Sequence, residues 1–136
     1  MSRVTITGSI DGSSKEIIEA IKLQLPERAY RGANELRNSA LYILQGQRSG
    51  RMYGGHQASA PGEPPAAWSG VFRNAWQPRS YGGGSSFTSR IENGVFYAGW
   101  LENGTPGGQM APRPHHQAIQ EHALPKIKRI YDEPYV

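Results

Sequence analysis

The histidines are the residues whose type and spacing most suggest chemistry. The segment HHQAIQEH holds His115, His116 and His122 together with Glu121. On a helix, His115 and His122 share a face but lie about 10 Å apart, because each residue adds about 1.5 Å of rise. Zinc ligands on one helix are normally about three or four residues apart. We therefore expect surface or interface histidines and no metal site, with a toxin or nuclease that uses the three histidines as a remaining alternative.

The segment WLENGTPGGQMAPRP sets an acid, Glu102, against a base, Arg113, across glycine, proline and small polar residues. Two glycine-rich stretches, GTPGG here and GGGSS upstream, could present backbone N–H groups to phosphate. Neither matches G-x-G-x-x-G or G-x-x-x-x-G-K-[ST]. We interpret WLENGTPGGQMAPRP as a joint in which Glu102 ends a strand and Arg113-Pro114 begin a helix. A Glu102–Arg113 ion pair across the turn is the specific hypothesis.

Other catalytic patterns are missing from the sequence. There is no G-x-S-x-G motif, no carboxylate pair at a fixed helical or strand spacing, and no cysteine. We therefore expect no enzyme and no cofactor. The absence of cysteine fits a reducing cytoplasm, and no window approaches the roughly 18 apolar residues of a membrane span, so we expect a soluble protein made inside a cell.

Aromatic side chains alternate with arginines in the second half of the chain. The tryptophans and the arginines among them are Trp68, Trp76, Trp100, Arg73, Arg79 and Arg90. Such residues could stack nucleobases, and they also fill small cores and subunit interfaces. We favour interfaces. A small basic nucleic-acid-binding protein stays the alternative, because the net charge is +4 and the pI is about 9.6.

The patterning predicts one α+β domain over residues 1–136. Alternating β-branched residues predict a strand at about residues 3–8. A helix follows, with an apolar stripe at Ile17, Ile18, Ile21 and Leu25. Pro26 should end it and begin a second, long helix whose stripe is Ala29, Ala33, Leu36, Ala40, Ile43 and Leu44. A last helix, interrupted or restarted at Pro125, has Ile119, Ala123, Ile127 and Ile130 on one face.

Between the helices, residues 46–67 hold five glycines and three prolines and predict a long flexible loop. The segments GVFRNAWQPRSY, SSFTSRIEN and GVFYAGWLEN then predict a three-stranded meander, in which Asn93-Gly94 would form the second hairpin. Together with the N-terminal strand, the meander forms an antiparallel sheet packed against the long helix and the C-terminal helix.

Three segments, taken in order, resemble the tail-completion or tail-to-head joining proteins of long-tailed phages and prophages, also called neck or minor head–tail connector proteins. KLQLPERAYRGANELRNSA is similar to that family's short helix, Leu-Pro-Glu and long Ala-rich helix. APGEPPAAWSGVFRNAW resembles its proline-rich approach to a small-hydroxyl–Gly–x–apolar–Arg motif. That motif falls on Ser69, Gly70, Phe72 and Arg73, and Trp68 stands where the family has an acid.

The third segment resembles the family's Tyr-Ala, Glu-aromatic-Gly-Thr, short variable loop and Ala-Arg-Pro, which lead into the C-terminal helix. The matching positions are Tyr97, Ala98, Glu102, Gly104, Thr105, Met110, Arg113 and Pro114. Asn103 replaces the usual aromatic residue, and His115-His116 replace a Phe-Leu type pair. The packing beneath this turn should therefore differ from that of the family.

The resemblance implies a virion structural protein that forms a homo-oligomeric ring, six-fold in the assembled tail, with a channel for DNA passage. The implied partners are a head connector or head-completion protein and a tail terminator or tail-tube protein, with no membrane. The implied location is the head–tail neck of the virion, after assembly in the host cytoplasm. In such a ring the loop 46–67 would order against neighbours. Arg48 and Arg51 would contact a partner or DNA in transit.

Overall fold

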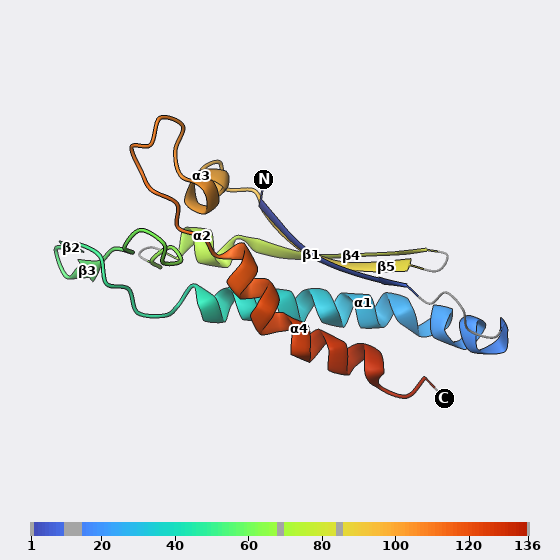
Figure 1. Ribbon diagram of the computed structural model, residues 1–136. Helices are drawn as coiled ribbons and strands as arrows, with labels where there is room; N and C mark the ends of the chain where they lie inside the picture. The colour runs from blue at the N-terminus through green and yellow to red at the C-terminus, as the bar shows by residue number, and fades with distance from the viewer. Residues whose placement is uncertain (1, 10–14, 68–69, 84–85, 136) are drawn as a thin grey trace.

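The computed structural model describes residues 2–9, 15–67, 70–83 and 86–135. These form a sheet layer and a helix layer, with the sheet lying along α1 and with α4 packed against α1 (Figure 1). The helices and strands are β1 (Ser2–Ser9), α1 (Lys15–Ile43), β2 (Met52–Tyr53), β3 (His56–Gln57), α2 (Val71–Asn74), β4 (Trp76–Gly83), β5 (Ser86–Asn93), α3 (Ala98–Asn103) and α4 (His116–Asp132). None of the described helices is both long and apolar enough to cross a membrane.

The main sheet has three strands in the order β1-β5-β4, and both pairings are antiparallel. Along the central strand β5 every second side chain is buried, which is the alternation expected of a sheet with one covered face. Val4 and Ile91 are paired on that face and contribute to the core. The predicted α+β architecture, with a sheet packed against a long helix and a C-terminal helix, is confirmed.

Small residues on α1 let the helix lie close to the sheet. Ala29 and Ala33 are fully buried. A Cβ atom on Gly32 would meet Ser89 Oγ at 2.6 Å, and that hydroxyl donates to the Ala29 carbonyl at 2.8 Å. Most positions of the predicted stripes are confirmed as buried in or directly after the two helices: Ile21, Leu25, Ala29, Ala33, Leu36, Ala40, Leu44, Ile119, Ala123, Ile127 and Ile130. Ile43 is partly buried, and the side chains of Ile17 and Ile18 lie outside the described residues.

Arg28 joins α1 to the end of α4. Its guanidinium is buried and donates hydrogen bonds to the carbonyls of Ile130 at 2.9 Å, Glu133 at 2.6 Å and Pro134 at 2.8 Å. The guanidinium therefore satisfies carbonyls in and directly after the last turn of α4, where the helix dipole is negative.

Two helices divided at Pro26 were expected, and this expectation is wrong. α1 runs from Lys15 to Ile43 with Pro26 inside it. Pro26 removes one helical hydrogen bond, but Leu25 and Ala29 on either side of it are buried, so packing holds both halves in one helix. α4 likewise continues through Pro125.

The third meander strand is also a wrong expectation. Residues 98–103 form helix α3, and Glu102 therefore lies in a helix and not at the end of a strand. A two-residue type I′ hairpin needs positive φ at both central residues, and neither Asn93 nor Gly94 has it. Instead the buried Asn93 amide donates to the Phe72 carbonyl at 2.9 Å and accepts from the Val95 N–H at 3.1 Å.

Candidate functional site

Residues from the second and third family-like segments meet around one groove at the α2–α3 end of the fold. The groove has a volume of about 300 Å³, and its walls also include part of the proline-rich loop. Among the predicted site residues, those that line it are Gly70, Phe72, Arg73, Tyr97 and Arg113. Ser69 lies outside the described residues. The groove therefore gathers residues that are up to 55 positions apart in the sequence, from 58 to 113.

Phe72 forms the floor where these segments meet. Gly70, with φ of 81°, precedes the short helix α2 and lets the chain turn into it. The Phe72 ring packs edge-on against Trp76 and His115, with centroid separations of 5.8 and 5.4 Å, and it touches Tyr97. An aromatic cluster therefore connects α2, β4 and the start of α4.

Arg73 and Arg113 are part of the groove walls. Arg73 Nε donates to the Leu41 carbonyl at 3.0 Å, which ties α2 to the end of α1. Arg113 Nε donates to Ser59 Oγ at 2.8 Å and Nη1 donates to the Ala111 carbonyl at 2.7 Å. Both guanidinium groups therefore position backbone segments.

Glu102 caps α4 from another helix, and the predicted Glu102–Arg113 ion pair is wrong. Glu102 Oε2 accepts hydrogen bonds from the backbone N–H groups of His115 at 2.8 Å and His116 at 3.2 Å. The N-cap residue of α4, His115, makes no capping hydrogen bond with its own side chain. The carboxylate at the end of α3 thus supplies the acceptor and the negative charge that a helix N-terminus requires.

The turn between Glu102 and His115 is fixed by its own hydrogen bonds. The Thr105 N–H donates to the Met110 carbonyl at 3.1 Å, and the Met110 N–H donates to Thr105 Oγ1 at 2.9 Å. Gly104 has φ of 83°, and a Cβ there would lie 2.9 Å from the Met110 carbonyl oxygen. The Arg113 N–H donates to the Leu101 carbonyl at 2.7 Å, after which Pro114 leads into α4. The predicted joint is therefore present, with Glu102 in a role that differs from the predicted one.

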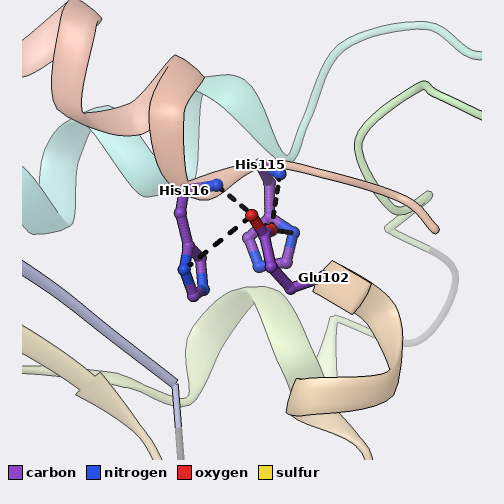
Figure 2. Close-up of side chains that lie close together, drawn as sticks. All are labelled: Glu102, His115 and His116. Atoms are coloured by element: carbon purple, nitrogen blue, oxygen red, sulfur yellow. Dashed lines mark hydrogen bonds and ion pairs between the residues drawn. The ribbon is translucent and has the colours of Figure 1, made fainter. Parts of the chain in front are cut away.

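His115 and His116 lie beside the carboxylate that caps their helix (Figure 2). His115 Nδ1 is 2.9 Å from the Arg113 carbonyl and 3.0 Å from Glu102 Oε2, while His116 Nδ1 is 3.9 Å from Glu102 Oε1. Burial lowers the pKa of both imidazoles, although Glu102 opposes this shift. Neutral rings are therefore favoured.

The expectation of surface or interface histidines is wrong for His115, whose side chain is 0% exposed. His122 has a different role from the other two, since its ring stacks on Tyr42 of α1 at 4.5 Å and its Nδ1 lies 2.8 Å from Ser39 Oγ. Among the described residues, the buried side-chain nitrogens that lack a hydrogen-bond partner are His115 Nε2, His116 Nε2 and Trp76 Nε1.

The loop 46–67 contains an internal hydrogen-bond network and the short β2–β3 hairpin. Arg48 donates to the carbonyls of Ile43 at 2.8 Å and Pro64 at 2.7 Å, so its guanidinium binds backbone. Glu63 accepts from Ser49 and Ala60, and these hydrogen bonds lower its pKa to about 2. Arg51 is exposed above the Tyr53 ring. The flexibility of the loop stays a prediction.

The outer face of the sheet holds basic residues that reasoning from the sequence did not gather. Arg3, Arg79 and Arg90, from three strands, lie within 4.0 Å of the Glu92 carboxylate. Arg90 also lies 5.1 Å from the Tyr81 ring centroid. Three arginines against one glutamate give this face a positive excess. Alternation with period two places each arginine on the outer face of its own strand. The order of the strands was also needed to predict that the three arginines lie close together.

Comparisons with protein-family models, with curated proteins and with solved structures give no match for this chain.

Proposed function

We propose that the chain is a structural subunit of a ring at the head–tail interface of a phage or prophage virion, with a channel through which DNA passes. The observation that supports it is the convergence of the family-like segments on the groove and on the Glu102 joint. There the Phe72 ring packs against Trp76, and the guanidinium groups of Arg73 and Arg113 donate to backbone carbonyls. That is the role of a scaffold, since their polar groups bind the chain itself.

Exposed aromatic side chains beside the groove favour a subunit that is covered by neighbours. Phe96 is 83% exposed and Trp100 is 44% exposed, and their rings contact each other edge-on at 6.0 Å. Val71 on α2 is also largely exposed. Aromatic anchors of this kind are enriched where subunits meet, and a ring would bury them.

The mass of the purified protein in solution tests the proposal. We expect sedimentation over a range of concentrations, with and without the head connector or tail-tube protein from the same genome, to reveal closed oligomers or a complex. Phe96→Ser should weaken assembly, whereas Leu124→Ser, on an exposed part of α4, should not. A monomer at every concentration that binds neither partner would refute the proposal. So would neighbouring reading frames that encode no portal, capsid, connector or tail-tube protein.

A second candidate function, nucleic-acid binding, is favoured by the outer face of the sheet. Arg3 and Arg79 are more than half exposed there, and Arg90 packs over Tyr81. Positively charged side chains and an aromatic ring therefore lie on one surface. The face would offer phosphate contacts, which bind nucleic acid without reading its sequence.

Fluorescence anisotropy with single- and double-stranded DNA at low ionic strength tests this candidate. Changing Arg3, Arg79 and Arg90 to Gln should weaken binding and reduce the slope of log affinity against log salt by about 2–3. The matched control changes three basic residues of α4, Lys126, Lys128 and Arg129, to Gln. Undetectable binding by the parent protein, or equal losses in both triple variants, would remove the candidate.

A further inference from the structure

The end of α3 and the start of α4 bring three metal-ligating groups together. A ring nitrogen from each of His115 and His116 and a carboxylate oxygen of Glu102 all lie within 4.8 Å of one another. Figure 2 shows the two rings and the carboxylate on the same side of the α4 N-terminus, pointing toward one another. The ligands come from two elements, which is why spacing along one helix did not predict this set.

At His115 the hydrogen bonds leave the lone pair of Nε2 unused. The Arg113 carbonyl can only accept, so the adjacent His115 Nδ1 carries the proton and Nε2 carries the lone pair. His115 Nε2 and His116 Nε2 are buried without a hydrogen-bond partner among the described residues. Glu102 Oε2 accepts the two backbone N–H groups, while Oε1 faces His116 Nδ1 at 3.9 Å. One carboxylate can thus cap α4 and still offer its second oxygen.

A hollow of about 520 Å³ lies beside the cluster. Glu102 and His116 form part of its wall, and Glu121 contributes a second acidic group. His116 keeps 28% of its side chain exposed, so its ring can adjust when a ligand arrives.

We propose that Glu102, His115 and His116 form a binding site for a zinc-type divalent cation, which links the end of α3 to the start of α4. Two imidazoles and one carboxylate suit Zn²⁺ and leave a fourth position for water. Tetrahedral ligands with bonds of about 2.0–2.2 Å lie roughly 3.3–3.6 Å apart, so the widest separation in the cluster, 4.8 Å, would shorten by about 1.2–1.5 Å. The positive end of the α4 dipole opposes the cation, and Glu102 offsets it, so affinity is expected to be modest.

The proposed site is independent of ring formation. A cation there would stabilise the joint in a free subunit as well as in an assembly, because all three ligands belong to one chain. Its success or failure therefore leaves the proposed function unaffected.

Calorimetric titration of the EDTA-treated, tag-free full chain with ZnCl₂ tests the proposal. We expect one saturable site and a rise in unfolding temperature with ZnCl₂, since a cation that binds only the folded chain stabilises it. His116→Ala should lower zinc affinity by about tenfold or more, because even the loss of a group that only supports a ligand costs about 10–100-fold. His56→Ala, on the exposed strand β3, is the matched control and should bind like the parent.

Circular dichroism of the metal-free His116→Ala protein verifies that it folds, and Glu102→Gln provides a second variant that keeps an oxygen for the cap. Shifts in the imidazole ¹⁵N resonances of His115 and His116 on zinc addition identify the ligands directly. The proposal is overturned if the parent shows no saturable site, if His116→Ala and Glu102→Gln both bind like the parent, or if His56→Ala loses binding equally. In those cases the two histidines serve packing alone.

Discussion

Replacing Glu102 by alanine should loosen the first turn of α4 and destabilise the whole chain. The Glu102 side chain is 17% exposed and accepts two backbone hydrogen bonds, at 2.8 and 3.2 Å, from the N-terminus of α4. Removing a helix cap costs about 0.5–2 kcal/mol, and hydrogen bonds to charged groups contribute about 1.5–3 kcal/mol. Because both N–H donors would be left without this acceptor near the core, we expect a loss of about 2–3 kcal/mol in the free energy of unfolding.

The assay is urea unfolding at about pH 8 in the presence of EDTA. His115 and His116 are then neutral and no metal is bound, so the change in unfolding free energy reports the loss of the cap alone. A loss of this size should lower the unfolding temperature by about 8–12 °C in a domain of this length. Glu102→Gln keeps an acceptor oxygen but loses the charge that favours the helix dipole, so it should cost only about 1 kcal/mol. Glu121→Ala, on the exposed side of α4, is the control and should stay within about 0.5 kcal/mol of the parent.

Hydrogen exchange localises the effect. The amides of His115 and His116 should lose protection in Glu102→Ala, while those at the end of α4 keep most of theirs. The cap is refuted if Glu102→Ala is as stable as Glu121→Ala, or if exchange at these two amides is unchanged.

Three further predictions concern Arg28, Gly32 and the pH dependence of stability. Arg28→Ala should cost about 3–4 kcal/mol in urea unfolding, because it leaves buried carbonyls at the end of α4 without their donor; a cost below about 1 kcal/mol would contradict that role. Gly32→Ala should cost about 1–3 kcal/mol through overpacking against Ser89, and combining it with Ser89→Gly should recover part of the loss. Burial lowers the folded-state pKa of His115 and His116, so the unfolded chain takes up protons first as pH falls. Stability should be full above about pH 6.5 and fall below it, by at most about 1.4 kcal/mol per pH unit for each histidine, until the folded-state pKa is reached. A flat profile of metal-free stability between about pH 5 and 8 would contradict it.

Local periodicity predicted the helical segments of α1 and α4, since it depends on which face each residue occupies, but it assigned α2 and α3 to strands. The buried stripes of α1 and α4 were visible in the sequence because both helices pack one face against the sheet or each other. The prediction of a helix end at Pro26 was wrong because it used the local propensity of proline to break helices. The burial of Leu25 and Ala29, which outweighs that propensity, depends on tertiary packing. The hairpin predicted at Asn93-Gly94 is absent for a related reason, because the Asn93 side-chain amide donates a hydrogen bond to the Phe72 carbonyl of another segment.

The joint was harder to predict in detail than in outline. A search for opposite charges pairs Glu102 with Arg113, because every residue except proline has the same backbone N–H donor, which therefore carries no signal in the sequence. The shape of the turn around Gly104 decides that Glu102 reaches the start of α4. The burial of His115 and its proximity to Glu102 follow from that geometry, and so could not be foreseen from helical spacing alone.

Electron cryomicroscopy of the neck, in virions made by the phage or prophage that encodes this chain, tests the proposed function most directly. We expect copies of the chain to form a closed ring around a DNA channel between the head connector and the tail tube, with Phe96 and Trp100 buried between neighbouring subunits. A complete neck that contains no copy of the chain would contradict the proposal.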